Sequence, residues 1–560
     1  MVNAPIVRFY SCRGVASEIN PHANPFAIFT NDQNRNANAE REKSSSRFQL
    51  IRKASEISPS SILHSMSRTS SHFCDLDIDN EEERERDDIC YIEEGGTKEV
   101  DEQHSEKPQQ PPIPKKRVSR LSIILLDQGL FTVYKRLFVT SLFLNVLALV
   151  LAATGRFTYA RNRASLFSLA NILVLTLCRS EAFLRLVFYL TVNILGHSFV
   201  PLRIKTAATS LLQSLGGIHS GCGVSSIAWL VYALVLTLKN RDNASTAIIA
   251  VAFAILSLLC LTSLAAFPLV RHLHHNVFER VHRFSGWAAL GLVWAFIVLM
   301  ISYDPISRSY TDNLGSKLIK TQDFWFTLAI TIAVVLPWLS VRRVPVDVSS
   351  LSGHASLIKF RGGVKSGILG RISPSPLSEW HAFGIISDGK TSHMMLAGAV
   401  GDFTKSLVSK PPTHLWVRTV HFAGLPYLVN LYDKVKYISI KLRILACITC
   451  GHRFGDLCIL SFIMQQSKAE VYLIWVAKGL DDNFGSEIVK RIKDYPHQDR
   501  IVVHDTAILG RPNVSEMSVK ASKKFEAQVV IVTSNPEGSR DVVNACKASG
   551  VPAFGPIWDS

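Results

Sequence analysis

The sequence predicts an α-helical transmembrane bundle, preceded by a disordered polar tail and followed by a soluble region. That region is predicted to begin as an antiparallel β-barrel and to end as an α/β unit. Three observations support this fold class: residues 1–118 are polar, residues 137–341 hold long apolar stretches, and residues from 344 onward form short runs separated by turn residues. The predicted boundaries are 1–118, 119–343, 344–445 and 446–560.

Residues 1–118 form the predicted tail, which is rich in Ser, Asn, Glu, Arg and Pro. Large apolar residues do not recur in it with helix or strand spacing, and Asn80–Asp88 is an acidic run mixed with Arg. Such a segment cannot bury enough apolar area to offset the entropy of ordering it. We therefore expect the tail to be disordered.

Apolar stretches long enough to cross a bilayer, about twenty residues each, fill the middle of the chain. We expect six spans, with seven as the alternative: Leu137–Thr154, Ser165–Leu195, Ser220–Leu238, Ser245–Val270, Phe284–Tyr303 and Phe324–Val341. The second span contains Arg179, Glu181 and Arg185, so it is either one helix kinked near Arg179 or two shorter helices. Glu181 and Arg185 lie four residues apart, so they can meet on one helix face, and we interpret these charges as structural or as marking the break in the span.

The charge pattern orients the predicted bundle. Six spans place both termini on one side, and the flanks on that side carry more Lys and Arg than the opposite loops, which indicates the cytosol. We expect a multi-pass protein of the plasma membrane or an endomembrane, with the lipid bilayer as its partner. The net charge of +16 does not indicate nucleic acid, because the basic residues flank apolar spans and form no single stripe.

The soluble region changes pattern near residue 446. Before it, short β-branched runs separated by Gly, Pro and Ser are typical of an antiparallel barrel. After it, strands alternate with helices, which predicts a parallel sheet with crossover helices. The expected strands are Val471–Ala477, Ile501–Val503 and Val529–Thr533, and the expected helices are Gly485–Ile492, Val514–Phe525 and Arg540–Ser549.

Two motifs in the barrel region resemble the ferric reductase and NADPH oxidase superfamily. Glu379–Ser387 reads Glu-Trp-His-Ala-Phe-Gly-Ile-Ile-Ser and is similar to that superfamily's flavin strand, and Gly401–Leu407 reads Gly-Asp-Phe-Thr-Lys-Ser-Leu and is similar to its following element. The resemblance implies a ferredoxin-reductase-like module that binds FAD and NAD(P)H.

A narrower resemblance is to the TmpA-type integral membrane proteins of fungi and their plant relatives. It covers about residues 120–560 and rests on four segments: His219–Cys222, Phe278–Trp287, Trp380–Ser387 and Pro552–Ser560. It implies flavin-linked redox chemistry without naming a substrate.

The implied flavin strand supplies three side chains. His381 and Ser387 are expected as polar contacts and Phe383 as an apolar wall. Ala382 and Gly384 stand where the superfamily usually has Pro and Thr. The alternative is an ordinary β-strand.

The implied phosphate contact follows at Gly401 and Thr404, where the amides of a helix N-terminus can meet an anion. The alternative is a simple helix cap made by Asp402 or Thr404.

The implied nicotinamide loop departs from the family pattern. Thr449–Gly455 stands where Thr-Gly-x-Gly-Ile is usual, and its two glycines, Gly451 and Gly455, have bulky residues between them. Near the terminus, Trp558 or Phe554 either stacks on the flavin or anchors the chain end to the last sheet.

The superfamily holds two haems between paired histidines on the third and fifth spans. His219 begins the third predicted span, but fourteen residues further on stands Ala233, so a second haem lacks ligands. One haem, held by His219 with His275 or His282, is the expectation that remains. The alternative is an interfacial basic cluster that faces anionic lipid head groups.

The sequence therefore predicts a membrane-bound oxidoreductase that passes electrons from NAD(P)H through FAD to an unknown acceptor. The alternative is a relative that has kept the fold, lost catalysis, and acts as a membrane signalling or scaffold protein. A transporter is disfavoured, because no inverted repeat is evident.

Overall fold

The computed structural model describes the residues 8–10, 16–18, 132–310, 314–399, 401–432, 443–449, 461–462, 465, 470–494, 497–534 and 536–555. The chain divides into two compact units, Met1–Met66 and Ser67–Ser560. In the first unit, β1 (Arg8–Tyr10) pairs antiparallel with β2 (Ala16–Glu18). The remainder of the tail that we expect to be disordered lies outside the described residues.

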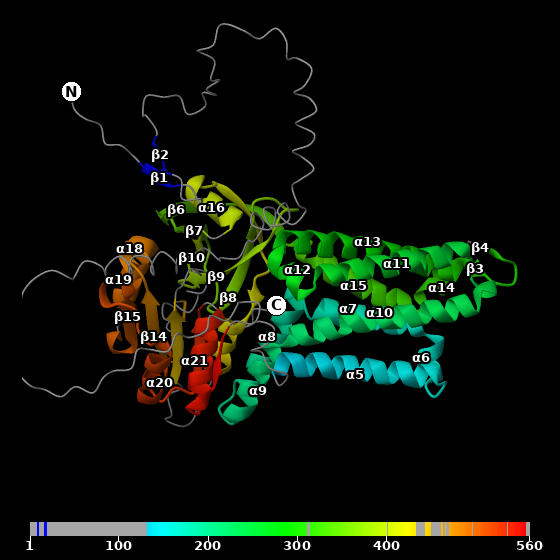
Figure 1. The fold of residues 1–560 in the computed structure, drawn as a ribbon, viewed down its shortest axis with the longest axis horizontal. Helices are drawn as coiled ribbons and strands as arrows, with labels where there is room; N and C mark the ends of the chain where they lie inside the picture. The colour runs from blue at the N-terminus through cyan, green and yellow to red at the C-terminus, as the bar shows by residue number, and fades with distance from the viewer. Residues whose placement is uncertain are drawn as a thin grey trace, which may run out of the picture. The chain divides into compact units, whose positions relative to one another are not determined.

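Long apolar helices follow. Within the described residues, five are long and apolar enough to cross a membrane, judged by length and composition. They are α5 (Val133–Ala153), α10 (Leu215–Lys239), α11 (Thr246–Ala265), α13 (His275–Ser302) and α15 (Gln322–Leu339). The shorter apolar helix α7 (Ala164–Leu177) packs on α10 and α15, and α10 also packs on α5 and α11. Figure 1 shows these helices running side by side.

Short elements connect these helices. They are α6 (Thr158–Asn162), α8 (Glu181–Leu195), α9 (Leu202–Gln213), α12 (Pro268–Leu273), the strands β3 (Tyr303–Asp304) and β4 (Ser309–Tyr310), and α14 (Gly315–Ile319). Helix α8 contacts elements of the following sheet region, and α9 contacts both that region and α5.

The stretch expected as a second span consists of two helices. This confirms the alternative of two shorter helices over that of one kinked helix. Helix α7 ends at Leu177 and α8 begins at Glu181. The break falls at Arg179, where a charged side chain is costly in an apolar environment. Glu181 and Arg185 do not pair with each other: Glu181 forms ion pairs with two arginines of the sheet region, and Arg185 donates to the carbonyl of His421, 3.0 Å away.

Small and polar residues hold α5, α7 and α10 together. The amide oxygen of Asn145 accepts hydrogen bonds from Asn171 Nδ2 at 2.8 Å and from Trp229 Nε1 at 3.0 Å. Trp229 is fully buried. At Gly217 the backbones of α10 and α5 approach so closely that an added Cβ would lie 2.2 Å from the carbonyl oxygen of Tyr134. Small residues at such contacts are typical of helices that pack in membranes.

Antiparallel strands form the next layer, an eight-stranded sheet of order β5-β11-β8-β9-β10-β7-β6, with β12 paired to β8. The strands are β5 (Val341–Pro345), β6 (Asp347–Ser352), β7 (Ala355–Arg361), β8 (Ile368–Ser373), β9 (His381–Ser387), β10 (Ser392–Gly398), β11 (His414–Arg418) and β12 (Phe422–Ala423). The two ends of the strand order, β5 and β6, are consecutive in the chain with only Val346 between them. The sheet therefore curls until its edges adjoin, as the barrel prediction requires. Helix α16 (Asp402–Ser409) and the 3₁₀ segment η3 (Leu425–Tyr432) pack on it.

The last layer is a five-stranded parallel sheet of order β15-β14-β13-β16-β17. Its strands are β13 (Arg443–Thr449), β14 (Glu470–Ala477), β15 (Ile501–Asp505), β16 (Val529–Thr533) and β17 (Ala553–Phe554). Its helices are α18 (Leu480–Lys493), α19 (Thr506–Leu509), α20 (Val514–Lys524) and α21 (Pro536–Ala548). The parallel sheet and its alternation with helices are confirmed, while the predicted boundary between 445 and 446 falls inside β13.

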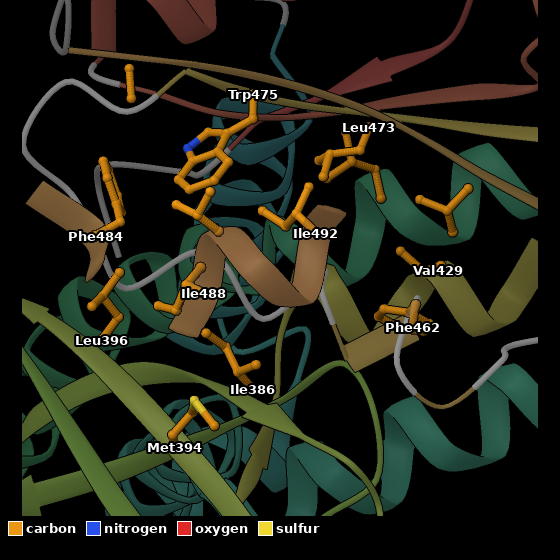
Figure 2. Packing of buried hydrophobic residues seen from close by; sticks show 14 of the residues in the cluster. Ile386, Met394, Leu396, Val429, Phe462, Leu473, Trp475, Phe484, Ile488 and Ile492 are labelled. Atoms are coloured by element: carbon orange, nitrogen blue, oxygen red, sulfur yellow. The ribbon is translucent and has the colours of Figure 1, made fainter. Parts of the chain in front are cut away.

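A shared core joins the two sheets. Figure 2 shows that Phe484, Ile488 and Ile492 of α18 lie between the two sheets. Trp475 of β14 is on one side, and Ile386, Met394 and Leu396 of the antiparallel sheet are on the other. Trp475 is fully buried. Burying an indole and its aliphatic neighbours in this way removes a large apolar area from water. The two sheets therefore form one continuous packing unit.

Asp505 holds the start of α18. Its carboxylate accepts the backbone N–H groups of Gly479, Leu480 and Ala507, each at 2.9 Å. Partial burial alone would raise the pKa of Asp505, but these N–H donors bring that pKa below its ordinary value. The carboxylate therefore stays charged at neutral pH.

We expect Asp505→Asn to lower the free energy of unfolding by about 1 kcal/mol at pH 7, because the neutral amide offers one acceptor oxygen instead of two to these N–H groups. Because the pKa of Asp505 is lower in the folded than in the unfolded chain (about 3.9), the charge stabilises the fold fully above about pH 4. The difference between the two proteins should shrink as the pH falls through the folded-state pKa. Thermal unfolding at neutral and acid pH checks this, and an undiminished difference in acid would contradict it.

Candidate functional site

The candidate site centres on the start of β9. There, the side chains of two consecutive residues point in opposite directions. The ring of His381 stacks on Phe403 of α16, with centroids 4.8 Å apart and planes 16° from parallel. Trp380, the preceding residue, packs edge-on against Trp338 of α15, with centroids 6.4 Å apart. Alternation along an extended chain produces this split. The segment thus touches α16 on one side and the apolar helices on the other.

Helix α16 begins beside His381. The hydroxyl of Thr404 accepts the backbone N–H of Gly401 at 3.0 Å and donates to the carbonyl of Gly401 at 3.1 Å. Thr404 therefore caps the helix, as one of the two alternatives proposed. The first-turn amides and the positive end of the helix dipole lie at the same place, so the cap and an anion contact are compatible.

Phe383 and Ser387 lie further along β9. Phe383 is 9% exposed and belongs to the core cluster of the antiparallel sheet that also contains Phe403. The hydroxyl of Ser387 accepts the N–H groups of Val364 and Gly389 and donates to the carbonyl of Ser392. One donated and two accepted bonds use the whole capacity of a hydroxyl. Ser387 would reach a flavin only by giving up one of these bonds.

A buried group of charged and aromatic residues lies on the other side of Trp380. We define the junction cluster as Glu181, Trp338, Arg371, Trp380 and Arg418. Glu181 forms ion pairs with Arg371 and, at 2.9 Å, with Arg418; the side chain of Glu181 is 8% exposed and that of Arg418 13%.

Aromatic rings frame the Arg418 guanidinium, which lies over the rings of Trp380 at 4.8 Å and Trp338 at 5.6 Å. Burial lowers the pKa of Arg418 and the charge of Glu181 opposes that shift. The junction cluster thus joins α8, α15 and two strands.

Further contacts extend this connection into α13. Trp338 packs edge-on against Trp287 of α13, with centroids 5.2 Å apart. One turn earlier, Arg283 donates to the carbonyl oxygens of Leu377 at 3.3 Å and Ser378 at 3.2 Å, in the loop before β9. The strand expected to bind flavin is therefore anchored to the helix that carries His282.

His219 and His282 share one hydrogen-bonding pattern. Nδ1 of His219 lies 2.9 Å from the carbonyl oxygen of Leu175, and Nδ1 of His282 lies 3.1 Å from that of Thr262. A carbonyl oxygen only accepts, so each Nδ1 carries the proton and each Nε2 keeps its lone pair. Such a second partner on Nδ1 is the usual arrangement of a histidine that ligates a metal.

The other predicted site residues are not placed in detail. Gly451, Gly455 and Trp558 lie outside the described residues, and of His275 only the backbone at the start of α13 is described. No group of three or more His, Cys, Asp or Glu side chains able to hold a metal occurs among the residues that the structure describes.

The parallel sheet has a topological switch point. Its strand order reverses direction between β13 and β16, and ligands of such sheets bind beyond the carboxyl ends of the strands at that point. Thr449 and Thr533 end these two strands. Both predicted glycines come within six residues after Thr449 in the chain, so the expected nicotinamide loop begins at the carboxyl end of β13.

Sequence reasoning missed most of the junction cluster. Trp338, Arg371 and Arg418 lie in separate segments, and nothing in their spacing marks them as neighbours. The signal that could have found them is Glu181, because an acid in an apolar stretch needs a cationic partner, and that partner can come from another element of the fold.

Comparisons with known proteins point to reductases. Residues 443–560 match the family model described as adenylate-forming reductase 03009, C-terminal domain. Adenylate-forming reductase 03009 of Coprinopsis cinerea is 32% identical over 453 residues, which are 80% of this chain and 42% of that protein. Adenylate-forming reductase 06235 of the same fungus is 31% identical over 455 residues, again 80% of this chain and 42% of the relative. The chain thus spans about 42% of the length of these curated relatives.

Solved structures resemble the chain only distantly. Flavohemoglobin from Malassezia yamatoensis aligns with a TM-score of 0.32 at 12% identity, covering 68% of this chain and 98% of that one. Ferredoxin-NADP+ reductase from Plasmodium falciparum aligns with a TM-score of 0.29 at 10% identity, covering 39% of this chain and 95% of that one. The curated relatives show that the chain is similar to proteins named as reductases.

Proposed function

We propose that the chain is a membrane-bound, flavin-dependent oxidoreductase of the TmpA type, within the ferric reductase and NADPH oxidase superfamily. NAD(P)H would bind at the switch point of the parallel sheet, FAD on the antiparallel sheet, and electrons would pass to an acceptor at the cytosolic face of the membrane. The observation that carries the proposal is the order of three structures in one chain: apolar helices, a curled antiparallel sheet and a parallel sheet.

The relatives' names support reductase chemistry. We propose only the reductase activity for this chain, and not adenylate formation, since the match covers 42% of each relative.

The residues at the start of β9 suit a flavin nucleotide. The N-terminus of α16 offers amides to a phosphate, and the partly exposed ring of His381, which stacks on the buried Phe403, lies beside it. FAD would supply the ability to accept a hydride from nicotinamide and to release electrons onward. The chain's own part is to hold the ring near the junction cluster, which ties this strand to the helices.

His219 and His282 suit a haem iron, since both present Nε2 and both are oriented by a backbone carbonyl. Of the two partners considered for His219, His282 is therefore the one we propose. The pair would hold a single haem, which would supply one-electron transfer.

The visible absorption spectrum of the full chain, purified in mild detergent, tests cofactor binding. We expect flavin bands near roughly 370 and 450 nm, with FAD released on heating. A protein that stays colourless after incubation with FAD would contradict the proposal.

Haem binding makes a separate prediction. We expect His219→Ala and His282→Ala each to abolish the Soret band and to leave the flavin bands unchanged, because each variant removes one of the two residues that would hold the haem. His354→Ala, which changes an exposed histidine of the antiparallel sheet region, is the matched control and should keep both. A Soret band that survives both ligand substitutions would overturn this assignment.

A second candidate is a relative that keeps the fold without catalysis and serves as a membrane scaffold or signalling protein. Two observations favour it. Backbone groups of Val364, Gly389 and Ser392 use the whole hydrogen-bonding capacity of the Ser387 hydroxyl, and the spacing of Gly451 and Gly455 is altered. The absence of flavin from a folded, monodisperse preparation would select this function.

A further inference from the structure

We propose that α8 and α9 form an in-plane membrane anchor, with their outer face lying in the lipid head-group region. This rests on the membrane placement proposed above and adds to it a surface outside the spanning helices. Helices α8 and α9 are the link between α7 and α10, so they lie at the end where one apolar helix stops and the next begins.

Helix α8 is unsuited to crossing the bilayer. Its 15 residues span about 22 Å, against a hydrocarbon core of about 30 Å. Its N-terminal half is also held to the antiparallel sheet, through Glu181 with Arg418 and through Arg185 with the carbonyl of His421. A helix fixed to a soluble sheet cannot enter the membrane core lengthwise.

The two faces of the α8–α9 hairpin differ sharply. The inner face is buried against β12 and η3: Phe188 is 4% exposed and packs with Leu212 of α9 and Leu428 of η3. The outer face leaves apolar side chains exposed at helical spacing. They are Phe183, Leu186, Tyr189, Leu190 and Ile194 on α8, Phe199 in the connection, and Leu202, Ile204 and Leu211 on α9.

Exposure on this outer face is high. Ile194 is 62% exposed and Phe199 80% exposed. A soluble protein rarely leaves so many large apolar side chains together on its surface. An amphipathic helix that lies in a bilayer interface has this division of faces.

Charge and continuity indicate lipid as the occupant. The only acidic residue between positions 181 and 213 is Glu181, which is buried and paired with two arginines. The segment also contributes basic residues, of which Arg203 is exposed, and these suit anionic head groups. The face adjoins the bundle because α9 packs on α5, whose Phe143 is 61% exposed.

The test places a photoreactive benzophenone amino acid at position 194 of the full chain, reconstituted in nanodiscs of mixed zwitterionic and anionic phospholipid. Position 143 on α5 is the positive control, and position 508 is the negative control, because Ile508 is equally apolar and 80% exposed on α19. We expect lipid adducts at 194 comparable to those at 143 and at least ~10-fold above those at 508.

Each other outcome decides against the anchor. Lipid adducts at 143 without adducts at 194 overturn it and leave the membrane placement intact. A crosslink from 194 to a second copy or another protein overturns it in favour of a protein interface. Adducts at neither position remove the membrane placement together with the anchor. Flavin content measured on the same samples reports separately on the cofactor proposal.

Discussion

Replacing Glu181 with Gln is expected to destabilise the chain by about 3 kcal/mol, because it leaves Arg418 buried without a counter-ion. The loss should approach that size since the Glu181 and Arg418 side chains are only 8% and 13% exposed. Arg371 is a third exposed and contributes less, because water screens its charge. Thermal unfolding of the purified full chain in detergent measures the effect.

Glu487 provides the matched control for this substitution. It forms an ion pair with Lys359 at 2.7 Å, and both side chains are more than a third exposed. Glu487→Gln removes the same charge from the same kind of pair, but exposed pairs contribute less than about 1 kcal/mol. Equal losses in the two variants would show that the junction cluster is not buried as described.

Replacing Gly217 with Ala has the second largest expected effect. The new Cβ would meet the backbone carbonyl of Tyr134 at 2.2 Å, and backbone, unlike a flexible side chain, cannot move aside. Helices α5 and α10 would have to separate, and overpacking of this kind costs about 1–3 kcal/mol. We expect a lower yield of folded protein and a lower unfolding temperature.

Gly223 lies on the same helix and has open space around its Cα, with nothing within 4 Å of an added Cβ. Gly223→Ala should therefore leave yield and unfolding temperature unchanged, or raise them slightly through its better helix propensity. If both alanine variants behave alike, the close approach of α5 and α10 is refuted.

Local patterns were sufficient to predict most of the fold. The strand Val529–Thr533 was predicted with its observed bounds, and Val471–Ala477 differs from β14 by one residue. Short β-branched runs between turn residues carry this information in the chain itself. The order of the antiparallel and parallel sheets along the chain could be predicted for the same reason.

Partners of charged residues could not be predicted in this way. Spacing placed Arg185 within reach of Glu181, yet Glu181 pairs with Arg371 and Arg418, about two hundred residues away. Ion pairs between elements depend on how those elements pack, which local periodicity does not contain. The hydrogen bonds of the Ser387 hydroxyl could not be predicted either, because strand register decides that Val364 and Ser392 are its partners.

The central claim is electron transfer from a nicotinamide cofactor to a flavin held by this chain. The most direct test mixes the purified full chain with NADH, and separately with NADPH, in the absence of oxygen and follows the absorbance near roughly 450 nm. The account predicts that at least one of the two cofactors bleaches the flavin band rapidly and completely. Bound flavin that neither cofactor reduces, although dithionite does, would contradict it.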